Sequence, residues 1–216
     1  MFVYDHWDKI CKELSLNHDC ILANQILDQD KNKNWTVVKH DVETNVSKAL
    51  KLAKIEAKYN IRATYYVQSC LLKDNESQLK DISSLGHEVT YHYDVLDSNN
   101  GDYKVAIKEF DETISKFKES GFIVRTVCPH GNPIVNRNGW SSNKDFFRNK
   151  EISEKFSDIL DIVVHLPSKL EKKYVYISDA AYSWKIISNV EGNDVKNKGD
   201  QEISDFFKVL SDNKDC

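Results

Sequence analysis

Residues 36–43 of the chain read TVVKHDVE. The first half is apolar or β-branched, which predicts a buried strand over residues 35–40. The strand leads into His40, Asp41 and Glu43, so three possible metal ligands or proton carriers stand at its carboxyl end. In α/β sheets and barrels this end is where catalytic groups collect. A structural alternative is that Asp41 or Thr44 caps the helix that follows.

The composition is that of a globular protein and excludes several functional classes. The 216 residues are 40% hydrophobic and 30% charged, which favours one folded domain over residues 1–216. The net charge of −4 comes without a basic block, so nucleic acid is not an expected partner. No uncharged apolar run reaches the ~18 residues that a membrane span requires. The amino terminus lacks a signal-peptide pattern and the five cysteines lack a CxxC spacing, so we expect reduced thiols and a cytoplasmic location.

Strand and helix patterns alternate along the chain. The predicted strands lie at residues 35–40, 61–67, 88–93, 122–128, 161–165, 174–178 and 184–190. The predicted helices lie at residues 4–15, 46–57, 103–120, 151–158 and 203–210, with a further one through Leu79 and Ile82 that Gly86 ends. Residues 22–27 fit either a short helix or a strand. Because strands joined through helices pair in parallel, this order predicts an α/β fold with a mostly parallel, barrel-like sheet.

Polar side chains stand at the carboxyl ends of four predicted strands. These are His40, Asp41 and Glu43, then His92 and Asp94, then His130, and finally Asp179. In a barrel or wound sheet these ends share one rim, so we expect the side chains to converge. Mixed histidine and carboxylate ligands suit Zn²⁺ or another divalent first-row metal, which lowers the pKa of bound water to about 7 and polarises an acyl oxygen. The structural alternative is a hydrogen-bonding role for each histidine and a core position for Trp184.

Five stretches, taken in order, resemble a known family. They are KHDVE (39–43), RATYYV (62–67), LGHEVTYHYD (85–94), CPHGNP (128–133) and SDAAYSW (178–184). The chain from Tyr4 to Trp184 resembles the NodB-type polysaccharide deacetylases, carbohydrate esterase family four. It is most similar to the branch whose first motif reads His-Asp-Val-Asp, found among bacterial surface-polysaccharide and O-antigen genes. The resemblance implies a distorted (β/α) barrel of about seven strands and metal-dependent removal of acetyl groups from sugars.

The resemblance assigns roles to the first two motifs. Asp41 matches the catalytic base, and Glu43 matches the metal carboxylate in place of the usual aspartate. His40 could take either role. His92 matches the first of two metal histidines, but the second position, four residues later, holds Leu96, which cannot bind metal. The implied cofactor is a divalent metal, with Zn²⁺ the first choice. If no other side chain replaces the missing second histidine, the implied cofactor is none.

The later motifs supply the remaining candidates. Asp94, Asp97 or His130 would have to complete the metal shell, and the Pro-Gly loop around His130 has a fixed backbone. Asp179 and Trp184 resemble the acid and the tryptophan of the fourth motif, whereas the late histidine of the fifth motif has no match. The expected set is therefore catalytic Asp41, His130 and Asp179, metal-binding His40, Glu43, His92 and Asp94, and substrate-binding Asn132 and Trp184.

Two functions remain open from the residues. The first is a metal-dependent deacetylase acting on a nucleotide- or lipid-linked sugar in bacterial surface-polysaccharide (lipopolysaccharide) biosynthesis. The second is a catalytically inactive relative that binds a carbohydrate or a biosynthetic partner such as a glycosyltransferase. Loss of the second metal histidine favours the second function, whereas retention of many ionisable groups on one rim favours the first. A hydrolase of another class, such as a phosphoesterase, is a third and weaker alternative.

Overall fold

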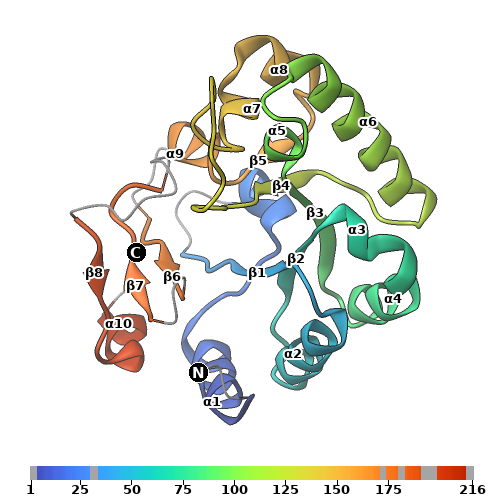
Figure 1. Ribbon diagram of the computed structural model, residues 1–216. Helices are drawn as coiled ribbons and strands as arrows, with labels where there is room; N and C mark the ends of the chain where they lie inside the picture. The colour runs from blue at the N-terminus through green and yellow to red at the C-terminus, as the bar shows by residue number, and fades with distance from the viewer. Residues whose placement is uncertain (1–3, 30–33, 171–173, 180–182, 191–198, 213–216) are drawn as a thin grey trace.

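Five parallel strands form the central sheet of the protein. The computed structural model describes residues 4–29, 34–170, 174–179, 183–190 and 199–212 (Figure 1). The sheet has the order β1-β2-β3-β4-β5, so every strand pairs with the next one along the chain. The strands are β1 (Val38–Val42), β2 (Ala63–Val67), β3 (Glu88–Tyr93), β4 (Thr126–Pro129) and β5 (Leu160–Asp161). The prediction of an α/β fold with parallel pairing is confirmed.

Helices surround these strands on the outside, as Figure 1 shows. The longer ones are α1 (Tyr4–Asn17), α2 (Val46–Lys58), α4 (Glu76–Ser84) and α6 (Tyr103–Glu119), which lie where the apolar spacing predicts them. The shorter ones are α3 (Ser69–Leu72), α5 (Val95–Ser98), α7 (Asp145–Arg148), α8 (Lys150–Lys155), α9 (Leu166–Lys169) and α10 (Phe206–Asp212). Two 3₁₀ turns, η1 (Ala23–Asp28) and η2 (Lys73–Asn75), complete the described elements, and η1 resolves the alternative at residues 22–27.

Strand β3 shows how side-chain alternation separates the core from the site. Tyr91 and Tyr93 point outward, and their ring centroids lie 5.6 and 5.8 Å from that of Phe110 on α6. His92, between them, points the other way and bonds to the next strand inside the sheet. Each buried aromatic ring contributes on the order of 2 kcal/mol of hydrophobic stabilisation, so the register of β3 is firmly set. The predicted alternation of this strand is therefore confirmed, and it fixes the direction of His92.

The carboxyl-terminal third of the chain differs from the sequence prediction. β5 ends at Asp161, because its Oδ1 accepts hydrogen bonds from the amides of Val163 and Val164 and turns the chain out of the sheet. The strands predicted at residues 174–178 and 184–190 are shorter in the structure. Each contains two strand residues, in β6 (Ile177–Ser178) and β7 (Lys185–Ile186).

The strands β6 and β7 belong to a second sheet. They pair in antiparallel fashion, and β8 (Gln201–Glu202) adds a third strand. Six residues separate β6 from β7, and a connection that short joins only antiparallel strands, since a parallel pair needs a crossover of about a dozen residues. The described residues thus contain five parallel strands, where the resemblance implied about seven. Within the same residues, no helix combines the length and apolar character needed to cross a bilayer.

Candidate metal centre and active site

Strand β1 sends its polar side chains to two different faces. Lys39 and Asp41 share one face, and both carboxylate oxygens of Asp41 accept hydrogen bonds from Lys39 Nζ at 2.9 Å. His40 points to the opposite face, where its Nε2 lies 2.6 Å from Oε1 of the buried Glu56 on α2. Glu43 follows directly after the strand. Because residues alternate along a strand, the motif cannot direct all its ionisable groups at one point.

Glu43, His92 and His130 meet at the carboxyl end of the sheet. Nδ1 of His130 lies 3.0 Å from Oε1 of Glu43 and 3.3 Å from Nε2 of His92. Nε2 of His92 lies 3.4 Å from the same Glu43 oxygen. The three side chains come from the ends of β1, β3 and β4. Each therefore projects from the rim that the parallel strands share.

The orientation of His92 prepares one ring nitrogen for a ligand. Its Nδ1 lies 3.0 Å from the main-chain oxygen of Cys128, so this nitrogen carries the proton. The lone pair of Nε2 then faces Glu43 and His130. His92 is 1% exposed, which keeps the ring in this position. Metal-binding histidines in proteins are commonly oriented by such a bond from the other nitrogen.

The electrostatics of the cluster favour charged carboxylates. The hydrogen bond from His130 lowers the pKa of Glu43, and the same bond raises the pKa of His130. Burial acts to raise the pKa of Asp41, but the neighbouring Lys39 ammonium outweighs it and lowers that pKa. Glu43 and Asp41 are therefore both anionic at neutral pH, and the Lys39 ammonium offsets the charge of Asp41.

The donor set and its spacing fit a divalent metal. Ligand bonds of about 2.0–2.1 Å in a tetrahedral shell place neighbouring ligand atoms about 3.3 Å apart. The three atoms of Glu43, His92 and His130 are separated by 3.0, 3.3 and 3.4 Å, close to that spacing. A second group, of Asp41, His92 and Cys128, also has ligand atoms within 4.8 Å of one another. It fits less well, because Asp41 is bonded to Lys39 and burial raises the pKa of the Cys128 thiol.

Two residues expected among the metal ligands lie outside this cluster. The ring of His40 packs against Tyr65, with centroids 4.7 Å apart, and is bonded to Glu56. Asp94 lies near His130, and burial raises its pKa while His130 acts to lower it. Neither of the two groups of ligand atoms found in the described part of the chain includes His40 or Asp94. The structure thus brings Glu43 together with His92 and His130 instead.

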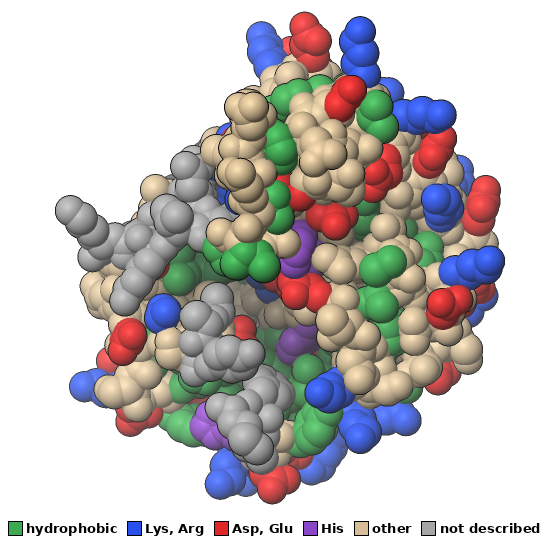
Figure 2. All heavy atoms as spheres, viewed as in Figure 1, with side chains coloured by type: hydrophobic (Ala, Val, Ile, Leu, Met, Phe, Trp, Pro, Cys, Tyr) green, Lys and Arg blue, Asp and Glu red, His purple; other side chains and the backbone are tan. Residues whose placement is uncertain are grey.

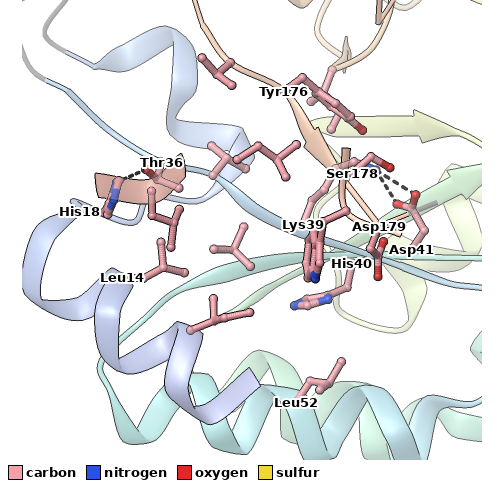
Figure 3. A pocket seen from close by; sticks show the side chains of 18 of the residues that line it. Leu14, His18, Thr36, Lys39, His40, Asp41, Leu52, Tyr176, Ser178 and Asp179 are labelled. Carbon is pink, nitrogen blue, oxygen red and sulfur yellow. Dashed lines mark hydrogen bonds and ion pairs between the residues drawn. The ribbon is translucent and has the colours of Figure 1, made fainter. Parts of the chain in front are cut away.

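A cavity of about 660 Å³ runs along β1 beside these residues. The residues that line it include Lys39, Asp41, Glu43, Asp179 and Trp184. Figure 3 shows the Lys39–Asp41 pair in this cavity with Asp179 nearby, and Figure 2 shows the hollow with acidic and histidine side chains inside. Asn132, the other residue expected to bind substrate, lies in the loop after β4 and is half-buried. Its main-chain oxygen accepts a hydrogen bond from Arg137 at 2.8 Å.

Trp184 has a packing role as well as a place on the cavity wall. Its ring centroid lies 4.4 Å from that of Phe206 on α10, with the planes inclined by 45°. One side of the indole is thereby covered by α10. Trp184 therefore packs partly against α10, as the alternative of a core position predicted, and it also lines the cavity.

The sequence reasoning gave no role to Lys39, the partner of Asp41. A signal for it was present, since Lys39, Asp41 and Glu43 are spaced two apart and so share a direction along the strand. Lys39 also lies 3.5 Å from Sγ of Cys128. The Asp41 carboxylate raises the pKa of Lys39 although burial opposes it, so this ammonium stays charged beside the cluster.

No family model and no curated protein matches the sequence. Several solved structures are similar to it. A family 4 carbohydrate esterase from Streptomyces lividans, in complex with acetate, aligns with a TM-score of 0.41 and 15% identity over 65% of this chain and 59% of that one. A mutant of the peptidoglycan deacetylase PdaC from Bacillus subtilis gives 0.40 and 17% over 62% and 59%. A carbohydrate esterase family 4 pseudoenzyme from Bacillus anthracis gives 0.40 and 16% over 62% and 46%. The chain thus spans about half to three fifths of the length of these proteins. At these TM-scores and identities, the similarity assigns no function to the chain.

Proposed function

We propose that this protein is a metal-dependent hydrolase that removes an acetyl or related acyl group from a sugar. One observation carries the proposal. Glu43, His92 and His130 form a ligand triangle with edges of 3.0–3.4 Å, and the anionic Asp41 lies on the same rim beside a cavity. The sequence motifs around these residues resemble those of the NodB-type deacetylases, which supports the choice of an acyl group and a sugar.

Each residue of the site has a part in this chemistry. Glu43, His92 and His130 would hold the metal, for which the donor set suits Zn²⁺. Such an ion, when bound, polarises the acyl oxygen and acidifies water. Asp41 orients the attacking water and accepts its proton. Because Lys39 lowers the pKa of Asp41, this carboxylate should remain charged, and so available as a base, at neutral pH.

The cavity supports a carbohydrate substrate. Its volume of about 660 Å³ exceeds that of one sugar ring and leaves room for the group to which the sugar is linked. Trp184 and Asp179 on its wall combine an aromatic surface with a hydrogen-bonding group, a pairing that suits a sugar. Asn132, in the loop that carries His130, is a further candidate for contact. From the motif resemblance we extend the proposal to a nucleotide- or lipid-linked sugar in surface-polysaccharide biosynthesis.

A second candidate function is carbohydrate binding without catalysis. One observation favours it: Leu96, at the position of the second family histidine, is 0% exposed and belongs to the hydrophobic core. The site therefore has no ligand from that position. In this alternative the cavity binds a sugar near Asp179 and Trp184, and the histidine cluster is held by its own hydrogen bonds.

Metal content and acyl release together test the proposal. Purified wild type, incubated with Zn²⁺, Co²⁺ or Mn²⁺ and desalted, should retain one ion per chain by elemental analysis. Glu43→Ala and His92→Ala should retain none, with their circular dichroism unchanged. The matched control is His40→Gln, which alters a histidine on β1, the strand that Glu43 follows, but on the opposite face and should keep the ion.

Acetate release supplies the second measurement. The loaded protein should release acetate from a panel of N- and O-acetylated sugars and sugar nucleotides, and Asp41→Asn should keep the metal but lose that activity. A wild type that binds no ion at saturating metal contradicts the hydrolase proposal. Sugar binding measured by calorimetry, and lost in Trp184→Ala, would then establish the binding function.

A further inference from the structure

The loop that carries His130 is anchored by a buried asparagine. Asn143 is 0% exposed, and its Nδ2 donates to the main-chain oxygen of His130 at 2.9 Å and to Oδ2 of Asp97 at 2.9 Å. Its Oδ1 accepts from the amides of Leu96 at 3.1 Å and Asp97 at 3.0 Å. All four hydrogen-bonding positions of the amide are thus used. A flipped amide would set its oxygen against two acceptors, so the orientation is fixed.

Asp97 gives this asparagine a charged and rigid partner. Its carboxylate accepts two hydrogen bonds from Arg137, both at 2.8 Å, and one from Nε1 of Trp140 at 2.8 Å. The side chains of Asp97 and Arg137 are 8% and 10% exposed. Burial acts to raise the pKa of Asp97, but Arg137 and the other donors lower it, so the group is anionic. A bidentate, mostly buried pair of this kind sets geometry as well as charge.

The main chain of His130 is held at both of its polar groups. Its amide donates to the main-chain oxygen of Tyr93 at 2.7 Å, which continues the pairing of β3 with β4. Its carbonyl accepts from Asn143. The peptide groups on both sides of His130 are therefore fixed, and the ring has little freedom except rotation about its own side-chain bonds.

The same asparagine connects two positions that matter for the metal. Leu96 stands four residues after His92, at the start of α5. Its apolar side chain is buried in the core, and its main-chain amide donates to Asn143. Asn143 accepts that amide and holds His130 through its other end. The segment that lacks a metal-binding side chain thus supports the residue that supplies one.

We propose that Asn143 and Asp97 are positioning residues for the metal centre, holding His130 where its Nδ1 completes the ligand triangle with Glu43 and His92. The inference rests on the proposed function, because it concerns the same metal site. Supporting groups of this kind change metal affinity by about 10–100-fold when they are removed. Loss of the hydrogen bonds of Asn143 should therefore lower metal affinity more than the loss of a similar number of hydrogen bonds elsewhere in the loop region.

The test compares two asparagines. Asn143→Asp preserves the size of the side chain and the acceptors for both α5 amides, but it removes the donor to His130 and places a second carboxylate beside Asp97. Asn149→Ala is the matched control, because Asn149 caps α8 through the amides of Glu151 and Ile152 and makes no described bond to the metal cluster. Arg137→Gln, which leaves Asn143 in place and loosens Asp97, is the second variant.

Zn²⁺ affinity by competition with a chelating dye and the visible spectrum of bound Co²⁺ are measured for each folded variant. Asn143→Asp should lose about 10-fold or more in affinity and should show an altered Co²⁺ spectrum. Arg137→Gln should lose affinity to a smaller extent, and Asn149→Ala should keep wild-type affinity although it unfolds more easily. Equal affinity and spectra in wild type and Asn143→Asp overturn this inference alone. Failure of the wild type to bind Zn²⁺ overturns the proposed function, and the positioning role with it.

Discussion

Replacing Glu56 by alanine should destabilise the protein strongly and leave metal binding intact. The Glu56 carboxylate is 0% exposed and lies on α2, away from the metal cluster. It accepts hydrogen bonds from Nε1 of Trp7 at 3.0 Å, from His40 at 2.6 Å and from the hydroxyl of Tyr65 at 2.6 Å. The network is the reason that His40 is a structural residue in our account.

The expected magnitude comes from the donors that are left without a partner. Each buried donor that loses its acceptor costs about 1–3 kcal/mol, and Glu56→Ala strands three of them. Allowing for non-additivity, the free energy of unfolding should fall by about 4–6 kcal/mol. For a chain of this size that corresponds to a loss of roughly 10–20 °C in Tm. Glu56→Gln keeps the volume and an acceptor oxygen for Trp7 and His40, and its NH2 group can donate to the hydroxyl oxygen of Tyr65, so it should lose only about 1–2 kcal/mol.

Urea unfolding followed by circular dichroism measures both changes, and Zn²⁺ affinity is measured in parallel below the transition. The network and the ligand triangle lie on opposite faces of β1, so the affinity should not change in either variant. A Glu56→Ala variant that loses less than about 1 kcal/mol would contradict the stated energetics. Loss of metal from a folded Glu56→Gln variant would show that His40 belongs to the metal site after all.

Three further predictions concern pH and packing. In the metal-free protein, the raised pKa of His130 stabilises the fold below about pH 6.5, and this contribution is lost as pH rises through the raised pKa. Glu43→Gln should therefore lower the urea midpoint near pH 6 and not near pH 9. Burial raises the pKa of Asp161 to about 6, so wild type should lose on the order of 3 kcal/mol relative to Asp161→Asn as pH rises from about 4 to 7. Gly101→Ala would place a Cβ 2.4 Å from an indole carbon at a φ of +79°, and should lower Tm more than Gly139→Ala, where φ is +97° and nothing lies within 4 Å.

The main features of the fold could be predicted because they depend on local patterns. Apolar spacing along α2 and α6 and β-formers along β2 and β3 define the strand–helix order, and that order requires parallel pairing. The end of the sheet could not be located in this way. The apolar run after Asp161 resembles a strand, and only the side-chain bonds from Asp161 to two later amides show that the chain turns there. The six-residue connection between β6 and β7 was a usable signal for antiparallel pairing.

The candidate site divides in the same way. Glu43, His92 and His130 come from the ends of three neighbouring or next-neighbouring parallel strands, so their proximity is a consequence of topology. The place of His40 depends on its partner Glu56, which lies 16 residues later on α2, and no local sequence pattern connects the two positions. Asn143 could not have been identified either, since its four bonds join segments that become neighbours only after folding.

Anomalous diffraction from crystals grown with Zn²⁺ tests the central claim most directly. The account predicts one strong peak per chain within about 2.0–2.2 Å of the ligand atoms of Glu43, His92 and His130. Asp41 should then face the open side of the ion with Lys39 still bonded to it. Absence of a peak at that position under saturating Zn²⁺, or a peak held by Asp41 and Cys128 or by His40 and Glu56, would contradict it.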